Sequence, residues 1–522
     1  MKRKIFIFTL MTLILITLRA QEEDVWRVSV KKLASIMTLI EENYYQQTNR
    51  DELMYSSIRG MIQTLDPHSY FLDPNHFSRL REEHVGKYYG LGILITKQED
   101  RLVVVSPIEG GPAYRLGIQA GDVISQIEGE STKPISSYDA MQKLRGPKGT
   151  KVTITIVRDG LEDPFDVAIV REEISLYSVP YSFILQDDIG YIFIRNFSST
   201  TTREFEEKME ALVQQGMKKL ILDLRGNGGG TFVQSIELSD EFLPKGATVV
   251  SIKGRNKYYN KQFSAMRNNQ YEEIPLVILI NRGSASAPEI LSGAIKDNDR
   301  GIIIGEDSWG KGLVQTVFPL APDLAVALTT AKYFTPSGRS IQRDYTSLED
   351  YLFSRQVPDE GREVKFTSKG RKVFGQGGIT PDYLVSFSPK NITASLFARG
   401  AFFTYATRFA NKKTPLSKKF KFPDEKTVPG EEKLAPLQPN FYPDSRFLED
   451  FKAYLEEKKI EFDSPQFEEA QEEIKRELAR EIVSVIWGME EGTRVYRKKD
   501  PVVLKAVEVL PEAEGLVNDR AP

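Results

Sequence analysis

Between residues 189 and 305, short uninterrupted apolar runs alternate with segments of helical periodicity, and this alternation constrains the fold more than any other feature of the chain. A strand that is apolar throughout is buried on both faces, because an exposed face would carry polar residues at every second position. Strands that alternate with helices form a largely parallel sheet covered by those helices. The runs are GYIFIRNF, KKLILDL, VVSI, PLVILI and GIIIG, and the expected helices span 202–215, 232–242 and 288–296. We therefore expect an α/β core.

The remaining segments have different patterns. Apolar residues at helical spacing between 25 and 64 predict a small helical domain that ends at the turn sequence Asp66-Pro67-His68-Ser69. From about residue 88 the period is that of short strands separated by glycine and proline, and after about 391 the chain is polar and helical. The chain is thus multidomain, as 522 residues suggest. The expected boundaries are 1–20 for a signal peptide, 21–84 for the N-terminal helical domain, 85–172 for the strand-rich domain, 173–388 for the α/β core and 389–522 for a helical C-terminal region.

The first twenty residues have the pattern of a secretory signal. Three basic residues precede an apolar run over 5–18, and Ala20 precedes an acidic stretch. The run is shorter than the roughly 20 residues that cross a bilayer. We therefore expect cleavage near Ala20 and export to the periplasm or another extracytoplasmic compartment. An uncleaved segment would instead leave the protein associated with the membrane.

Composition excludes several classes of function. The net charge of -3 provides no electrostatic basis for binding nucleic acid. Without cysteine, the chain has no disulfide, no cysteine-ligated zinc and no cysteine nucleophile. The three histidines, His68, His76 and His84, all lie outside the α/β core, which disfavours a Ser-His-Asp triad. Their eight-residue spacing differs from the four-residue spacing of a zinc-binding helix. We expect no metal site and interpret the histidines as structural or surface residues.

Ser286 is a candidate nucleophile because of its position. The strand PLVILI runs into Asn281-Arg282-Gly283-Ser284-Ala285-Ser286 and then into a helix. A serine at such a corner is exposed, and the N-terminus of the helix offers amide donors to an oxyanion. The same segment, Ser286-x-x-Glu289, is also a capping box, which is common in proteins without catalysis. From this segment alone, both interpretations stay open.

Lys311 is a candidate base for a serine that has no histidine. Burial can lower the pKa of a lysine towards neutrality, which allows it to accept a proton. Lys311 follows the apolar run GIIIG and lies between Gly310 and Gly312, which permit close approach of another segment. The alternative is an exposed loop lysine.

The glycine cluster at 226–230 is the third candidate element. It follows a strand and precedes a helix, but Thr231 does not fit a dinucleotide-binding motif, and Gly-Lys-Gly at 310–312 lacks the Ser or Thr of a phosphate loop. Nucleotide binding is therefore disfavoured. The cluster suits either backbone N–H donation to an oxyanion or a tight turn.

Taken in order, these motifs give a specific resemblance. The chain resembles the carboxyl-terminal processing, or tail-specific, serine proteases over roughly residues 30–388, and the 25-residue separation of Ser286 and Lys311 agrees with that family. The motifs are LDPHSYFL (65–72), a PDZ-like domain, ILDLRGNGGG (221–230), GSASAPEIL (283–291), GKGLVQ (310–315), YFTPSGRSIQ (333–342) and GGITPD (377–382).

The resemblance implies an α/β protease core of the crotonase/Clp-protease-like type. It implies that Ser286 is the nucleophile, Lys311 its general base and Gln315 the residue that orients the lysine. The amides of Ala287 and Gly229, or Gly230 one residue on, would form the oxyanion hole. Such a serine endopeptidase needs no cofactor.

The resemblance further implies that a PDZ-like domain captures the C-terminal tails of substrate proteins. Its loop Gly90-Leu91-Gly92-Ile93 would bind the terminal carboxylate while the tail adds as a strand. Arg145 would couple this capture to the protease, or would merely pair with a surface carboxylate. The alternative functions are an inactive PDZ protein that binds tails and an acyltransfer or hydratase enzyme. The sequence leaves open an activating partner and a homo-oligomer.

Three features depart from the family. Pro288 replaces the usual serine, which is compatible with the start of a helix. Residues 343–376 separate two motifs that many members join directly, so a lid or an extra hairpin near the site is expected. Residues from about 390 onwards lie outside the resemblance, and their amphipathic helices would either mediate assembly or cover the core.

Overall fold

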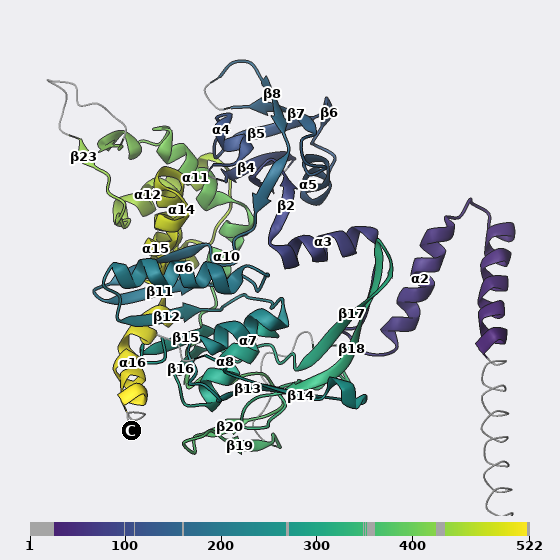
Figure 1. The fold of residues 1–522 in the computed structure, drawn as a ribbon. Helices are drawn as coiled ribbons and strands as arrows, with labels where there is room; N and C mark the ends of the chain where they lie inside the picture. Colours follow the sequence, from purple (N-terminus) through teal and green to yellow (C-terminus); the bar gives the residue numbers. More distant parts are fainter. Residues whose placement is uncertain are drawn as a thin grey trace, which may run out of the picture. The chain divides into compact units, whose positions relative to one another are not determined.

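Figure 1 shows the computed structural model, which forms two compact units. The first unit comprises Met1–Ser78 and Gln315–Thr329, and the second comprises Arg79–Val314 and Thr330–Pro522. The expected signal peptide lies outside the described residues. Among the described residues, no helix is both long and apolar enough to cross a membrane. The described residues are 26–518 without 99, 109, 159–160, 268–270, 348, 350, 352–360 and 424–433.

The first unit begins with two helices, as the apolar periodicity predicted. One spans 26–43, and the second, α2, spans Arg50–Gln63. The side chain of Asn49 caps α2 by accepting the N–H groups of Asp51 and Glu52. Most large apolar side chains of the first helix are exposed, because within this unit little packs against it.

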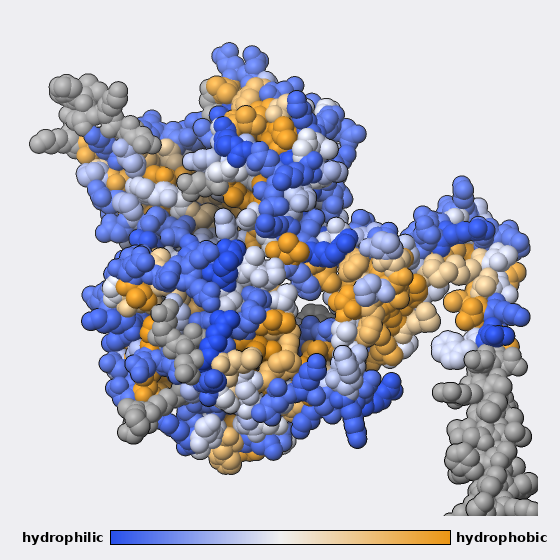
Figure 2. All heavy atoms as spheres, viewed as in Figure 1, coloured by the Kyte–Doolittle hydropathy of each residue, from blue (hydrophilic) through white to orange (hydrophobic). Residues whose placement is uncertain are grey.

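Part of a five-stranded antiparallel sheet completes the first unit. Strand β1 (Tyr70–Leu72) pairs with the hairpin formed by β17 (Leu313–Ala321) and β18 (Leu324–Phe334). Figure 2 shows apolar side chains gathered over this hairpin, where Phe318 and Leu320 are exposed.

The strand-rich domain of the second unit contains the short strands that the sequence predicted, together with two helices, α4 and α5. Its sheet has the order β3-β4-β5-β7-β8, so β3 is an edge strand. The helix α5 begins with a capping box between Ser136 and Asp139. The chain enters and leaves this domain through the antiparallel pair β2 and β9, preceded by α3. The elements are α3 (Pro74–Val85), β2 (Lys87–Gly90), β3 (Ile93–Gln98), β4 (Arg101–Pro107), α4 (Pro112–Arg115), β5 (Val123–Ile127), β6 (Glu130–Ser131), α5 (Ser137–Leu144), β7 (Lys151–Val157), β8 (Phe165–Val170) and β9 (Glu172–Ser175).

The α/β core contains the predicted buried sheet, in the order β10-β11-β12-β15-β16-β21. From β11 to β21 all neighbouring strands are parallel, and β15 is buried at every position. One prediction was wrong: the run VVSI was expected in the core sheet. It forms β13, which belongs to a separate antiparallel sheet with β14 and β18. The elements are β10 (Tyr181–Gln186), β11 (Ile189–Phe193), α6 (Thr201–Gln214), β12 (Lys219–Asp223), α7 (Phe232–Asp240), β13 (Thr248–Gly254), β14 (Lys261–Ser264), β15 (Leu276–Ile280), α8 (Ala287–Asp297), β16 (Ile302–Gly305) and β21 (Tyr383–Leu384).

Two hydrophobic clusters cover the two faces of this sheet. Alternate residues of β12 and β15 point to opposite faces, and α6, α7 and α8 cover one of them. The C-terminal helix α16 (Pro501–Asn518) covers the other face with residues such as Val503 and Leu510. This part of the C-terminal region therefore belongs to the α/β core.

Most of the remaining C-terminal helices form a third cluster rich in aromatic residues. Their helical character was predicted. Ion pairs connect the C-terminal region with the core sheet: Arg225 contacts both Asp223, the last residue of β12, and Asp500. Burial opposes ionisation of Asp500, but the charge and hydrogen bonds of Arg225 outweigh it and lower the pKa of Asp500 to about 2. The helices are α10 (Asn391–Ala398), α11 (Ala401–Ala410), α12 (Ser445–Glu457), α13 (Ser464–Glu469), α14 (Gln471–Trp487) and α15 (Met489–Arg497).

Glu241, directly after α7, gives the core a pH-dependent stability. Burial and the nearby carboxylate of Glu206 raise the pKa of Glu241 from 4.5 to about 7, against the attraction of Arg267. A raised pKa stabilises the folded state only while the group is protonated, so stability falls as pH rises from about 4.5 through 7. We expect wild type to lose about 2 kcal/mol relative to Glu241→Gln between pH 5 and pH 8. Urea denaturation at both pH values measures this. The exposed Glu210→Gln is the control, and parallel changes in wild type and Glu241→Gln would contradict the prediction.

Candidate active site

Ser286 lies at the corner between β15 and α8, as the sequence predicted. It has φ 65° and ψ −108°, a conformation that residues other than glycine rarely adopt, and its side chain is half-buried. Strain of this kind is concentrated at functional sites, where the surrounding structure must hold it. The carbonyl of Ser286 accepts the N–H groups of Glu289 and Ile290, which start the helix, and Pro288 fits in its first turn.

One buried carboxylate, that of Glu289, holds the corner and the lysine loop together. Its Oε2 accepts the backbone N–H of Ser286 at 2.7 Å and that of Lys311 at 3.0 Å. Its Oε1 accepts Ser308 Oγ at 2.5 Å and the N–H of Gly310 at 2.7 Å. The two backbone nitrogens that share Oε2 therefore lie within about 6 Å of each other. Burial raises the pKa of Glu289, while these four hydrogen bonds act in the opposite direction.

The loop that carries Lys311 follows β16 and packs closely on its surroundings. The side chain of Lys311 is half-buried. A Cβ atom at Gly310 would collide with Arg343 Cγ, and one at Gly312 would lie 2.9 Å from the backbone nitrogen of Gln342. The expected close approach at both glycines is thus present. The N–H of Trp309 donates to the carbonyl of Ser284, so this loop also contacts the serine loop directly.

The glycine cluster lies against the serine corner. Gly229 has φ 108°, and a Cβ atom there would lie 3.0 Å from Ser286 Cβ. Asn227 fixes the cluster: its side chain donates to the carbonyl of Ile194, and its carbonyl accepts the N–H of Ala285. The close packing explains why glycine is needed at 229.

The two predicted oxyanion donors differ in their surroundings. Ala287 is the first residue of α8, and N–H groups at that position have no acceptor within the helix. The N–H of Gly229 donates to Asn227 Oδ1 at 2.9 Å. Gly229 would have to exchange this acceptor before it could bind an oxyanion, so its role stays a prediction.

Gln315 belongs to the first unit, whereas Ser286 and Lys311 belong to the second. Its amide Nε2 donates to Thr329 Oγ1 at 3.3 Å, and Thr329 Oγ1 donates to Asp66 Oδ1 at 3.1 Å. Burial disfavours the charge on Asp66, but hydrogen bonds from Ser69, His68 and Thr329 outweigh it and lower the pKa. The LDPHSYFL motif therefore supports the strand that carries Gln315, whose action on Lys311 stays a prediction.

The predicted tail-binding loop precedes the edge strand β3. Gly92 has φ 70°, and the carbonyls of Leu91 and Gly92 accept the N–H groups of Ala113 and Ile108. Gly90 ends β2, and Ile93 is the first residue of β3. The loop therefore leads directly into β3, which pairs with another strand on one edge only among the described residues.

Arg145 pairs with a carboxylate, and that carboxylate lies in the helix leading into the domain. Arg145 Nη1 donates to Glu82 Oε2 in α3 at 2.8 Å, and its guanidinium lies 4.2 Å from the ring centroid of Tyr88 in β2. These contacts join the domain to its entry segment. Coupling to catalysis stays a prediction.

The histidines occupy the places expected of structural residues. His68 lies in the turn after α2, and His76 Nδ1 lies 2.7 Å from Asp73 Oδ1. Burial lowers the pKa of His84, whose carbonyl accepts the N–H of Ser199. In the part of the chain that the structure describes, no group of three or more His, Asp or Glu residues is placed to hold a metal ion.

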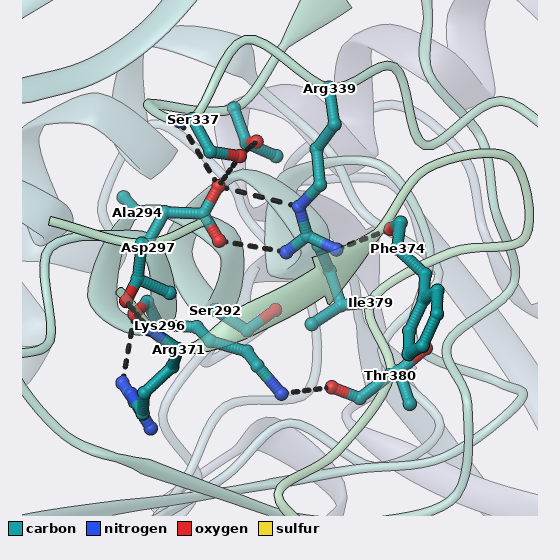
Figure 3. A network of polar contacts seen from close by, with 12 residues as sticks. Ser292, Ala294, Lys296, Asp297, Ser337, Arg339, Arg371, Phe374, Ile379 and Thr380 are labelled. Carbon is teal, nitrogen blue, oxygen red and sulfur yellow. Dashed lines mark hydrogen bonds and ion pairs between the residues drawn. The ribbon is translucent and has the colours of Figure 1, made fainter. Parts of the chain in front are cut away.

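A second polar network, shown in Figure 3, anchors the C-terminal end of α8. Asp297 and Arg339 form an ion pair at 2.8 Å, and neither side chain is exposed. Lys296 donates to the carbonyl of Thr380 and pairs with Asp382. Arg339 lies in the YFTPSGRSIQ motif, and Thr380 and Asp382 lie in GGITPD. These two motifs therefore support the helix whose other end carries Ser286.

Comparison with known proteins gives three matches to family profiles. Peptidase family S41 matches residues 188–348, a PDZ domain matches 103–158, and the activating protease CtpB N-terminal domain matches 16–76. The last match falls on the helical N-terminal segment and the second on the strand-rich domain.

Individual relatives extend these matches. The carboxy-terminal-processing protease of Bartonella bacilliformis is 38% identical over 315 residues, which cover 60% of this chain and 72% of that protein. The carboxy-terminal processing protease CtpA of Bacillus subtilis is 34% identical over 362 residues, covering 66% and 76%. Among solved structures, a photosystem II D1 C-terminal processing protease is 29% identical, with 67% of this chain and 85% of that chain covered and a TM-score of 0.36.

Proposed function

The chain belongs to the carboxy-terminal processing serine proteases of peptidase family S41, and from this premise we propose that it is an exported endopeptidase that captures protein C-terminal tails in its PDZ domain and cuts peptide bonds with Ser286 and Lys311. One observation carries the assignment of the dyad. A single oxygen of Glu289 accepts the backbone N–H groups of both Ser286 and Lys311, which brings two loops from different strands to one point.

The proposed reaction passes through an acyl-enzyme. Neutral Lys311 Nζ takes the proton of Ser286 Oγ as this oxygen attacks the carbonyl carbon of the substrate. The oxyanion is stabilised by N–H groups at the start of α8 and in the glycine loop. The lysine ammonium then gives its proton to the leaving amine as the C–N bond breaks. In the second half, Lys311 accepts a proton from water, water attacks the ester, and Ser286 Oγ leaves with that proton.

Tail capture follows from the edge strand of the PDZ domain. An extended peptide adds to such an edge through main-chain hydrogen bonds, and its carboxylate is held by backbone N–H groups. The loop 90–93 directly before β3 is the proposed carboxylate site. Export rests on the signal pattern of residues 1–20, which predicts an extracytoplasmic protein. An activating partner is tested in the assay below.

The function is tested by digestion of an unstructured protein with an apolar C-terminus, compared with the same protein carrying a C-terminal amide. We expect the mature chain to cut the free-acid form faster, about tenfold or more in kcat/KM, because amidation removes the captured charge. A fluorophosphonate should inactivate the enzyme and appear on Ser286 in peptide mapping. Cleavage of both forms at equal rates would overturn tail capture, and labelling elsewhere would overturn the nucleophile. If cleavage begins only when a partner is added, the partner is an activator.

A further inference from the structure

Residues 343–376 form an insert between two motifs of the family. The described part of this insert makes contacts in two places: at the C-terminal end of α8 and at the loop that carries Lys311. Its hairpin, β19 (Val364–Phe366) and β20 (Lys372–Phe374), is the extra hairpin that was expected, but it does not lie beside Ser286. The hairpin region packs at the C-terminal end of α8, where Thr367 and Arg371 both bind Asp299. Ser286 lies at the N-terminal end of this helix, so the hairpin stabilises the end of α8 that is remote from Ser286.

The other contact is made by Tyr351, which is buried with 2% of its surface exposed. Its hydroxyl accepts the indole Nε1–H of Trp309 at 3.0 Å, and the two rings meet edge to face at 5.6 Å. Burial raises the pKa of Tyr351, so its hydroxyl stays neutral. Trp309 is two residues before Lys311.

Trp309 connects the lysine loop with the serine loop. Its backbone N–H donates to the carbonyl of Ser284, two residues before the nucleophile, at 2.9 Å. The guanidinium groups of Arg282 and Arg343 lie 5.6 and 6.0 Å from its ring centroid. The orientation of this indole is therefore set by residues from three segments, and Tyr351 provides its hydrogen-bond acceptor.

The last residue of the YFTPSGRSIQ motif and the first residue of the insert contact the two glycines beside Lys311. Gln342 Oε1 accepts the N–H of Gly312, and the N–H of Arg343 donates to the carbonyl of Gly310, both at 2.9 Å. The backbone on either side of Lys311 is thus bonded to residues 342 and 343. From there the chain runs on to Tyr351.

We propose that the insert is a positioning element for catalysis, in which Tyr351 fixes Trp309 and thereby the loop that carries Lys311. Tyr351 acts through Trp309 and does not take part in the reaction itself. The inference rests on the proposed use of Lys311 as the base. Because a displacement of about 1 Å can cost two orders of magnitude in rate, a loosened loop is expected to lower kcat and leave KM nearly unchanged.

The test compares wild type with Tyr351→Phe, which keeps the ring and removes only the hydroxyl. We expect kcat to fall about tenfold with KM within about twofold. Backbone hydrogen exchange in the peptide covering residues 308–313 should become faster. Tyr345→Phe, whose ring lies 6.2 Å from that of Tyr351, is the matched control and should change neither quantity.

Trp309→Phe removes the donor of the same hydrogen bond and separates positioning from general stability. If the bond acts as proposed, the double variant Tyr351→Phe/Trp309→Phe will be no slower than the slower single variant. Unchanged kcat and unchanged exchange in Tyr351→Phe, with only a lower melting temperature, would overturn the proposal. Should wild type cleave no substrate, the proposed function fails, and the exchange of residues 308–313 still decides whether Tyr351 holds the loop.

Discussion

Ser286→Ala and Lys311→Ala are each expected to lower kcat/KM for peptide cleavage by about four orders of magnitude or more, and the double variant is expected to be no worse than either single variant. Alanine at 286 removes the attacking oxygen, and alanine at 311 removes the group that takes its proton. Because the two act as one unit, losing either stops the same step. Progress curves with a fluorescent tail-bearing substrate measure the effect.

Two controls separate this loss from damage to the fold. Lys245→Ala removes an exposed lysine of the same domain and should leave kcat/KM unchanged. Ser286→Ala should still bind a tail peptide with the affinity of wild type, because the PDZ domain is untouched. Activity of Lys311→Ala above about one hundredth of wild type would assign the base to another residue.

The elements of the core were predictable because their signals are local. Continuous apolar runs such as PLVILI identified buried parallel strands, and the intervening periodicity identified α6, α7 and α8 within one or two residues. The partner of a strand is a long-range property, so VVSI was counted among the strands of the core sheet, whereas it forms β13 in the second sheet. The sequence also did not predict that Gln315 belongs to the same compact unit as the N-terminal helices, because this depends on the long-range pairing of β1 with β18.

The candidate site was predicted only in part, for the same reason. Ser286, Lys311 and the glycine loop became candidates because each follows a recognisable strand, and the resemblance to the family gave them their expected roles. Glu289 was read as half of a capping box, and the N–H of Ser286 does donate to it. Its other donors, Ser308, Gly310 and Lys311, come from a loop about twenty residues later, and no local pattern connects them. Tyr351 was missed because the insert has no counterpart in the motifs.

Glu289→Ala is expected to cause the second large loss, in activity and in stability together. It leaves the N–H groups of Ser286, Gly310 and Lys311 without their acceptor in a buried site, and each unsatisfied group costs about 1–3 kcal/mol. We therefore expect at least about 3 kcal/mol of destabilisation and a fall in kcat of about 10²-fold or more. Chemical denaturation and steady-state kinetics measure the two effects.

Glu289→Gln distinguishes positioning from folding. The substitution preserves the shape of the side chain and one acceptor oxygen, so the loss of stability should be smaller than in Glu289→Ala. The new amide NH2 group faces at least one backbone N–H donor, and we therefore expect kcat to fall about tenfold or more. In wild type, burial raises the pKa of Glu289, so protonation on acidification begins at a higher pH than for an ordinary glutamate, whose pKa is 4.5. Activity should therefore fall as pH drops through that raised pKa. Glu289→Gln should lack this part of the acid limb and keep the part that protonation of the base Lys311 causes. Ser308→Ala removes one donor and leaves the three backbone N–H groups bonded to Glu289, so it should keep the loss of activity that follows protonation of Glu289. An identical pH profile in wild type and Glu289→Gln would show that the carboxylate has no part in positioning the dyad.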